Sequence, residues 1–523
     1  MEKQVKKGFW HGSLELGKEY LVPKQAEEGV WAMAKQVYPV EEWIEEATVD
    51  ELQQAMESGK RTAAELVLAY MARIAAYDKQ GPALNAVLEL NPDALAIAEA
   101  LDAERRSQGP RGPLHGVPVL LKDNIDTADK MHTSAGSLAL EGHYAASDAF
   151  LVKRLREAGA VILGKANMTE WANYMTQGMP GGYSSRGGQV LNAYGPKFGA
   201  GGSSTGSGVA VAANLCTLAV GTETSGSILS PAASSSVVGI KPTLGLISRS
   251  GIVPLAHSQD TAGPLARTVA DAALLLGAMA GTDPADPITG ASLGQVPADY
   301  RQFLEKDGLQ GARIGIPRAV YHDKLGEEER RAFEAHIAAL RLAGADVVDP
   351  ADIPSAQELA SFNSSVFRYE FKADVNAYLS KLAPHIPVHS LREVIAFNAK
   401  HFEKTLKYDQ ITLMRAEETS GTLTEAEYMR DRLKDLRLSR AEGIDAVMAR
   451  HRLDALLFPG TAGAAIAAKA GYPSIAVPGG YAADGRPLGV TFTGQAYSEH
   501  VLIRLAYAFE QLGPQRRKPV WPK

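Results

Sequence analysis

Apolar residues along the chain follow two different spacings. Over residues 66–77 an apolar residue recurs every three or four positions, which predicts a helix with one apolar face. Thr48 and Thr62 each precede a glutamate by three residues, the spacing of a capping box at a helix start. By contrast, residues 117–121 and 160–163 are short continuous apolar runs, typical of buried strands. Strands that alternate with helices in this way predict an α/β fold.

Further helix starts follow from polar capping residues. Asn91 before Pro92 predicts a helix that ends near Gln108, and Ser147 predicts one that runs through Glu157. Thr268, three residues before Asp271, is expected to cap an Ala- and Leu-rich helix. Residues 237–240 complete the strands of the N-terminal half.

The pattern changes after residue 283. Residues 283–311 look like a loop-rich connection, and residues 355–449 are charged and helical, a variable section expected near the active site. Around them we expect strands at 312–316, 346–348, 453–458, 474–477 and 488–492, and helices at 327–343 and 498–512. The expected organisation is an N-terminal arm or helix over 1–47, a single domain over 48–512 and a C-terminal tail over 513–523. In the arm, Trp31 and Trp43 are expected to pack on the main body.

Glycine, serine and threonine gather in two clusters, at 199–208 and 221–231. The residues between them, including 209–213 and 215–220, are almost wholly apolar, so these clusters are embedded in a core rather than forming a flexible linker. Glycine permits close backbone approach, and hydroxyls beside such backbone can act as nucleophiles or proton carriers.

Charge and cysteine content exclude several functions. The net charge of −6 gives no basic surface for nucleic acid. The single cysteine, Cys216, excludes a disulfide and a multi-cysteine metal site, and no His-Glu-x-x-His occurs, so we expect no metal and no cofactor. Without a signal peptide or an 18-residue apolar run, the protein is expected to be cytoplasmic, with no membrane partner.

The sequence does not match the common nucleotide-binding motifs, and its one match to a hydrolase motif lacks the required context. No Walker A or G-x-G-x-x-G pattern is complete. Gly202–Gly206 matches the G-x-S-x-G nucleophile elbow, but loop sequence at 195–200 stands where the elbow needs a strand. Lys122 is the last residue of a predicted buried strand, and α/β sheets bind ligands at the carboxyl ends of their strands. Its amine is therefore either a functional group or one that extends past apolar neighbours to water.

Several collinear motifs resemble the amidase signature family, over roughly residues 48–512. They are Gly116-Val-Pro-Val-Leu-Leu-Lys122-Asp-Asn, Gly164-Lys-Ala-Asn-Met-Thr-Glu170, Gly201-Gly-Ser-Ser-Thr-Gly206, Gly221-Thr-Glu-Thr-Ser-Gly-Ser-Ile-Leu-Ser-Pro-Ala232, Gly239-Ile-Lys-Pro-Thr243 and Pro473-Ser-Ile-Ala-Val-Pro-Gly-Gly480. The resemblance implies the fold of that family, a large mixed β-sheet covered by helices on both faces. Within the family, Gly-Thr-Glu-Thr-x-Gly-Ser-Ile is most similar to the peptide amidase-like enzymes.

The resemblance also implies roles for individual residues. Ser227 would be the nucleophile, Ser203 a bridging serine on a cis peptide bond and Lys122 the general base. The backbone N–H groups of Thr224, Ser225 and Gly226, with that of Ser227, would form the oxyanion hole. A buried strand end suits such a lysine, because burial favours the neutral amine that a base requires. Ser204, Lys241 and Asp123 are weaker candidates for supporting roles.

The expected reaction is hydrolysis of a carboxamide to an acid and ammonia through an acyl-serine. Peptide C-terminal amides and aliphatic or aryl amides are all candidate substrates, for a monomer or homodimer. An alternative is the glutaminase-type subunit of a multi-subunit amidotransferase, and a third is a catalytically silent binding protein. Ser225 and Thr205 stand where many family members carry glycine, and Leu229 where many carry arginine, which weakens the analogy with the amidotransferase branch.

Overall fold

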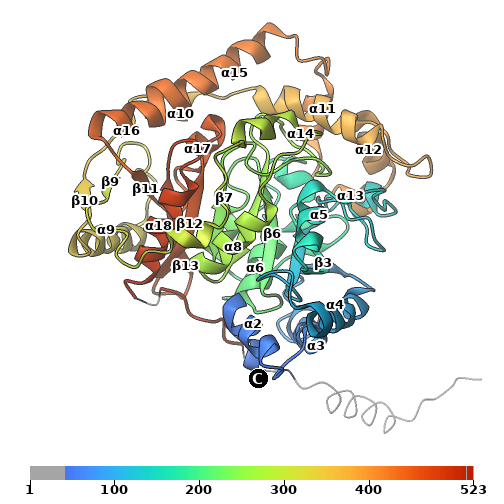
Figure 1. The fold of residues 1–523 in the computed structure, drawn as a ribbon. Helices are drawn as coiled ribbons and strands as arrows, with labels where there is room; N and C mark the ends of the chain where they lie inside the picture. Colours follow the sequence, from blue (N-terminus) through green and yellow to red (C-terminus); the bar gives the residue numbers. More distant parts are fainter. Residues whose placement is uncertain (1–39, 41, 514, 522–523) are drawn as a thin grey trace, which may run out of the picture. The chain divides into compact units, whose positions relative to one another are not determined.

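The structure is a computed structural model that describes residue 40, residues 42–513 and residues 515–521. In these residues eleven strands form one mixed sheet in the order β1-β3-β2-β6-β8-β7-β12-β13-β11-β9-β10 (Figure 1). The strands are β1 (Val87–Leu90), β2 (Pro118–Lys122), β3 (Val161–Ala166), β6 (Leu218–Glu223), β7 (Val238–Lys241), β8 (Thr261–Ala266), β9 (Arg313–Gly315), β10 (Asp346–Val348), β11 (Ala455–Pro459), β12 (Ser474–Tyr481) and β13 (Pro487–Thr493). A separate small hairpin pairs β4 (Tyr183–Ser184) with β5 (Gly188–Gln189).

Beside the edge strand β1, which pairs antiparallel with β3, strand direction divides the sheet into three parts. β3, β2 and β6 run parallel, as do β11, β9 and β10. The strands between these groups pair antiparallel, through β8, β7, β12 and β13. The parallel group therefore brings the carboxyl ends of β3, β2 and β6 to one edge, where α/β sheets form their ligand sites.

Helices cover both faces of this sheet. The main-body helices are α2 (Val49–Glu57), α3 (Ala63–Arg73), α4 (Ala94–Gln108), α5 (Phe150–Glu157), α6 (Thr205–Ala212), α7 (Leu229–Ser234), α8 (Val269–Met279), α9 (Glu327–Leu342), α17 (Ala464–Ala470) and α18 (Glu499–Glu510). From β2 the chain crosses through α5 to β3 on one side, and from β3 through α6 to β6 on the other. Right-handed crossovers in opposite directions place α5 and α6 on opposite faces. α8 contacts α5 and α18, whereas α7 contacts α6, so each face carries a helical layer.

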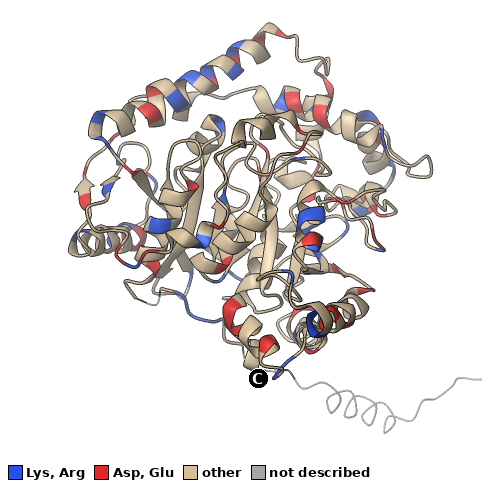
Figure 2. Ribbon diagram, viewed as in Figure 1, with Lys and Arg blue, Asp and Glu red and all other residues tan. Residues whose placement is uncertain are grey.

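Residues 355–449 form the expected helical section. Its helices are α10 (Ala356–Ser361), α11 (Val366–Leu379), α12 (Leu391–Lys400), α13 (Phe402–Thr405), α14 (Ile411–Glu417), α15 (Ala426–Ser439) and α16 (Asp445–His451). Charged residues are frequent on these outer helices, notably α15, and sparse on the central strands (Figure 2). No helix in the described part of the chain is long and apolar enough to cross a membrane.

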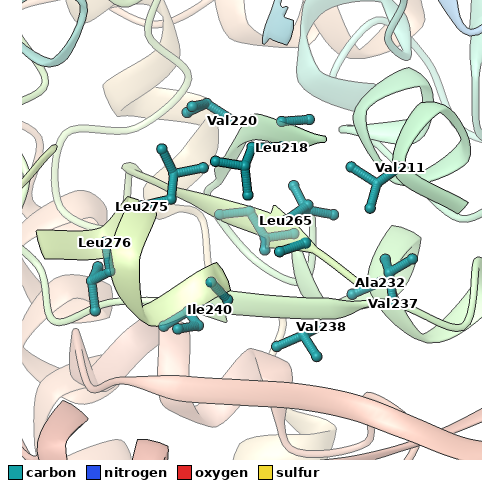
Figure 3. Close-up of a cluster of buried hydrophobic side chains, with 14 of the residues drawn as sticks. Val211, Leu218, Val220, Ala232, Val237, Val238, Ile240, Leu265, Leu275 and Leu276 are labelled. Atoms are coloured by element: carbon teal, nitrogen blue, oxygen red, sulfur yellow. The ribbon is translucent and has the colours of Figure 1, made fainter. Parts of the chain in front are cut away.

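The core forms where the central strands meet these layers. Leu218 and Val220 of β6, Leu265 of β8 and Leu275 of α8 are fully buried together with their neighbours (Figure 3). Burial on both faces of the sheet explains why the strands are continuous apolar runs rather than alternating ones. The buried lysines Lys122, Lys165 and Lys241 are therefore exceptions that need a chemical explanation.

Most predicted boundaries agree with the structure. Thr48, Thr62 and Thr268 cap their helices as expected. Asn91 and Ser147 are not N-caps: α4 begins after Asp93, whose N–H donates to the Asn91 side chain in a local turn, and α5 begins after Ala149.

Two strands of the main sheet, β1 and β8, have no counterpart among the predictions, and neither has the small hairpin of β4 and β5. β8 reads Thr-Ala-Gly-Pro-Leu-Ala, and its glycine and proline resemble a loop. Pairing with β6 and β7 makes it a strand, which local propensity does not reveal.

The two ends of the described chain meet. The Arg516 guanidinium donates to the Glu46 carboxylate and to the carbonyls of Ala212 and Ser236. Trp521 Nε1 donates to the Ala193 carbonyl at 2.9 Å. Trp43 lies against Arg61, and the prediction for Trp31 falls outside the described residues.

Candidate active site

Lys122 is the last residue of β2 and is fully buried. Its Nζ donates to Ser203 Oγ at 2.8 Å, to Thr222 Oγ1 at 2.8 Å and to the Thr222 carbonyl at 3.1 Å. β2 and β6 are parallel neighbours, so their carboxyl ends place Lys122 beside Thr222. The amine therefore turns inward to hydroxyls and does not extend to water.

Burial also sets the charge of this lysine. Removal from water lowers the pKa of Lys122 to about 7, against the opposing attraction of the Asp260 and Glu223 carboxylates. Near neutral pH a large fraction of the amine is consequently neutral and can accept a proton. A lysine at the surface would remain an ammonium ion and could not act as a base.

Ser203 lies within the first glycine cluster, just before α6. The Gly202–Ser203 peptide bond is cis. The segment is held by the chain that follows β3: Thr169 N–H donates to the Ser203 carbonyl at 3.1 Å, and Gly206 N–H donates to the Asn167 carbonyl at 2.9 Å. The third parallel strand thus contributes to the same edge, and together these bonds fix Ser203 against Lys122.

Ser227 follows β6 on the loop that leads into α7. It is 6% exposed, and its carbonyl accepts the Ser204 N–H at 3.1 Å, which joins the two glycine clusters. No hydrogen bond links the Ser203 and Ser227 hydroxyls in the described chain. Catalytic hydrogen bonds often tighten only when substrate is bound.

Glu223 organises the loop that carries Ser227. Its buried carboxylate accepts the N–H groups of Gly226 at 2.7 Å, Ile228 at 2.7 Å and Leu229 at 3.0 Å. The Gly226 N–H, one of the predicted oxyanion donors, is therefore occupied in this structure. Within the part of the chain that the structure describes, no acceptor is found for the N–H groups of Thr224, Ser225 and Ser227.

Gly226 has a conformational reason to be glycine. Its φ is +81°, and a Cβ built there would meet only the Ala464 Cβ at 3.7 Å. The left-handed backbone, rather than crowding by neighbouring protein atoms, therefore requires glycine here. Gly221, in contrast, is required by close approach, because a Cβ would lie 2.7 Å from Ser204 Oγ.

A cavity of about 510 Å³ opens beside these residues. Asn124, Thr222, Thr224 and Asp260 line it near Lys122 and the loop that carries Ser227. Its other walls include residues 249–255, His257 and part of α11. A larger cavity, of about 860 Å³, shares no lining residue with it and includes Ser230 and Ala233 of α7. The smaller cavity is the one that adjoins the partners of Lys122.

The weaker candidates have structural contacts. Ser204 Oγ donates to the Thr222 carbonyl at 2.9 Å and accepts the Thr222 N–H, which ties α6 to β6. Asp123 accepts the Gly136 N–H and lies 3.4 Å from the Arg186 guanidinium. Lys241 donates to the Tyr472 carbonyl at 2.6 Å, and burial lowers its pKa to about 8.

Thr222, Glu223 and Asp260 belong to the site but were not predicted as such. Thr222 and Glu223 lie inside the second glycine cluster, so their position in the motif is a signal that could have been used. Asp260 follows 33 residues after Ser227 in the sequence, and only strand pairing brings it to the site.

Among the described residues, one histidine–carboxylate cluster has ligand atoms close enough for a metal ion: His257, Glu370 and Asp374. Its members already pair with one another, because His257 Nδ1 lies 2.9 Å from Asp374 Oδ2 and His257 Nε2 lies 3.6 Å from Glu370 Oε1. The hydrogen bond to Asp374 raises the pKa of His257, as expected for an imidazolium between two carboxylates. An ion pair accounts for this cluster.

Comparison with known proteins identifies the class. The sequence profile of the amidase family matches residues 65–503. A native peptide amidase from Stenotrophomonas maltophilia is 47% identical, with a TM-score of 0.86 over 91% of this chain and 99% of its own. An Arabidopsis thaliana protein named "Probable amidase" is 43% identical over 91% of this chain and 92% of its own. A glutamyl-tRNA(Gln) amidotransferase subunit from Alkalilimnicola ehrlichii is 33% identical over 91% of this chain and 99% of its own.

The fold and these matches define an amidase, a hydrolase that acts on amide C–N bonds. The chain belongs to the amidase signature family, and the predicted similarity to its peptide amidase-like members is confirmed.

Proposed function

We propose that this amidase hydrolyses carboxamides to a carboxylic acid and ammonia through an acyl-Ser227 intermediate, with Ser203 and Lys122 as relay and base. The observation that carries the proposal is the 2.8 Å hydrogen bond from the buried Lys122 amine to Ser203 Oγ. With its pKa lowered to about 7, this lysine can take up a proton near neutral pH.

In the proposed reaction, protons move along a relay from Ser227 through Ser203 to Lys122. Ser227 Oγ attacks the amide carbon while its proton passes to Ser203 and the Ser203 proton passes to neutral Lys122. The N–H groups of Thr224, Ser225 and Ser227 stabilise the developing oxyanion. The resulting Lys122 ammonium returns a proton through Ser203 to the nitrogen, which leaves as ammonia. Water then cleaves the acyl-serine by the same relay and releases the acid.

The predicted use of the Gly226 N–H needs one adjustment. Because that group donates to Glu223, it can serve the oxyanion only if the loop rearranges. We therefore assign Gly226 the role of shaping the loop and leave oxyanion binding to its neighbours. Glu223 keeps the loop in the conformation that leaves these N–H groups free.

Peptide C-terminal amides, or aliphatic or aryl amides of similar size, are the substrates we propose. The 510 Å³ cavity falls within the range that holds small organic ligands. Its wall combines apolar residues such as Val253 and Leu255 with a few polar groups, which suits a peptide side chain next to the amide. The likeness to a peptide amidase supports the same choice.

The alternative is a glutaminase-type subunit that passes ammonia to a partner protein. The likeness to a glutamyl-tRNA(Gln) amidotransferase subunit favours it, at lower identity than the likeness to the peptide amidase. This alternative predicts that glutamine is the preferred substrate and that further subunits co-purify.

One experiment tests the function and separates the alternatives. Ammonia release is measured for wild type, Ser227→Ala and Lys122→Ala against peptide amides, short aliphatic and aryl amides, and glutamine. Ser234→Ala, a serine of α7 outside the proposed machinery, is the matched control. We expect turnover and fluorophosphonate labelling to be lost in Ser227→Ala and kept in the control. Full turnover by folded Ser227→Ala would overturn the proposal, and a preference for glutamine would favour the subunit.

A further inference from the structure

Asp260 lies at the point where β8 begins, directly beside the end of β6. Thr261 of β8 pairs with Glu223 of β6 in antiparallel register, so Asp260 comes opposite Thr224. Thr224 Oγ1 donates to Asp260 Oδ1 at 2.5 Å. The strand pairing thus delivers a carboxylate to the first residue of the proposed oxyanion loop.

The second oxygen of the Asp260 carboxylate also accepts hydrogen bonds. Asp260 Oδ2 accepts the N–H groups of Leu255 at 2.8 Å and Ala256 at 2.9 Å. These bonds hold the turn before β8 and leave the carboxylate no freedom to rotate away from Thr224. A carboxylate with three donors is a rigid anchor, because charge-assisted hydrogen bonds are stronger than neutral ones.

Asp260 also influences the charge of the site. Burial lowers the pKa of Lys122, and the negative charges of Asp260 and Glu223 act in the opposite direction. The contribution of Asp260 is the larger of these two. Burial raises the pKa of Asp260 to about 6, and repulsion from Asp374 acts in the same direction. Asp374 pairs with His257, and Arg249 pairs with Asp286, so these neighbours are already neutralised.

We propose that Asp260 is a positioning residue for amide hydrolysis: its carboxylate fixes Thr224 at the entrance to the oxyanion loop. The inference rests on the proposed function of Lys122 and Ser227. Thr224 and Asp260 both line the 510 Å³ cavity, so a displaced Thr224 would alter the space that receives the reacting amide.

Two substitutions separate the hydrogen bond from the charge of Asp260. Thr224→Val removes the hydroxyl but keeps the Asp260 charge, and Asp260→Asn removes the charge. The activity of an enzyme that needs neutral lysine rises with pH through the pKa of that lysine. Loss of a negative charge disfavours the ammonium form, so Asp260→Asn should move this rise to lower pH by about 0.5 or more.

The pH dependence of kcat and kcat/KM is measured for wild type, Asp260→Asn, Thr224→Val and Thr224→Ser. We expect Thr224→Val to lower kcat by about tenfold without moving the rise, because one charge-assisted hydrogen bond is lost. Thr224→Ser, which keeps the hydroxyl, should restore most of the activity. Asp260→Asn should lower kcat and also shift the profile.

The inference is overturned if Thr224→Val keeps wild-type kcat, or if a folded Asp260→Asn variant keeps wild-type kcat. If Asp260→Asn does not fold, Thr224→Val and its rescue by Thr224→Ser still decide the positioning role. Fluorophosphonate labelling of Ser227 in wild type is run in parallel. If Ser227 is labelled and Thr224→Val keeps wild-type kcat, only the role of Asp260 is contradicted. If the Ser227→Ala variant still turns over substrate, the proposed function itself is contradicted.

Discussion

Burial of Lys122 should make the stability of the protein depend on pH in a specific way. The pKa of Lys122 is about 7 in the folded protein and near 10.5 when the lysine is solvated. Between these values the unfolded chain binds a proton that the folded protein does not. The free energy of unfolding therefore rises with pH across this window, and below pH 7 the full cost of burying the amine is present.

The size of the effect follows from the difference in pKa. At about 1.36 kcal/mol per pH unit, the fall from 10.5 to about 7 corresponds to about 5 kcal/mol. Between pH 7 and pH 9 the lysine contributes up to about 2.7 kcal/mol of this. For 523 residues the entropy of unfolding is about 1.1 kcal/mol/K, so Tm should change by about 2–3 °C.

Lys122→Met isolates this contribution, because methionine fills similar space and does not titrate. Differential scanning calorimetry of wild type and variant at pH 7, 8 and 9 gives the difference in Tm. We expect the wild type to gain about 2–3 °C on the variant from pH 7 to pH 9. Substitution of an exposed lysine, Lys404→Met, should give a difference that does not change with pH. A wild-type Tm that stays constant or falls relative to that of Lys122→Met from pH 7 to pH 9 would refute the argument that burial keeps the amine neutral.

Three further substitutions test the contacts that shape the site and join the chain ends. Glu223→Gln should lower kcat about tenfold or more in ammonia-release assays, since the loop loses charge-assisted bonds; a folded variant with wild-type kcat would contradict this. Gly226→Ala, at φ +81°, should cost about 1–2 kcal/mol and lower both Tm and kcat. Gly485→Ala, at φ +90° with open space around it, is the control and should lower Tm but not kcat. Equal kcat values for Gly226→Ala and Gly485→Ala would argue that strain in the loop that carries Ser227 does not affect catalysis. Arg516→Ala should cost about 1–3 kcal/mol in thermal melts, because the Glu46 carboxylate and the Ala212 and Ser236 carbonyls lose a donor. Exposed Lys518→Ala, the control, should cost less than about 1 kcal/mol.

Most of the fold was predictable because its signals are local. The Thr48 and Thr62 capping boxes and the apolar runs of β2 and β6 lie in contiguous sequence. β8 was not predictable in this way, because its glycine and proline oppose strand formation and only its neighbours β6 and β7 compensate. Its absence from the prediction also hid Asp260.

For the site, the sequence by itself determined which residues to consider. The glycine clusters and the lysine at a strand end, through their family resemblance, selected Lys122, Ser203 and Ser227 without any tertiary information. Spacing along the chain cannot say how three residues from separate segments meet, nor which backbone N–H groups are free. Those depend on contacts between residues far apart in sequence.

Only the tertiary structure decided the properties on which the chemistry depends. The parallel strands β3, β2 and β6 bring their carboxyl ends to one edge, and that edge buries the Lys122 amine against Ser203 and Thr222. The pairing of β6 with β8 sets Asp260 opposite Thr224, and Glu223 takes up the Gly226 N–H. A residue type can be read from the sequence, but desolvation and hydrogen-bond partners come from packing, and these set the charge of the lysine and the donors left free for an oxyanion.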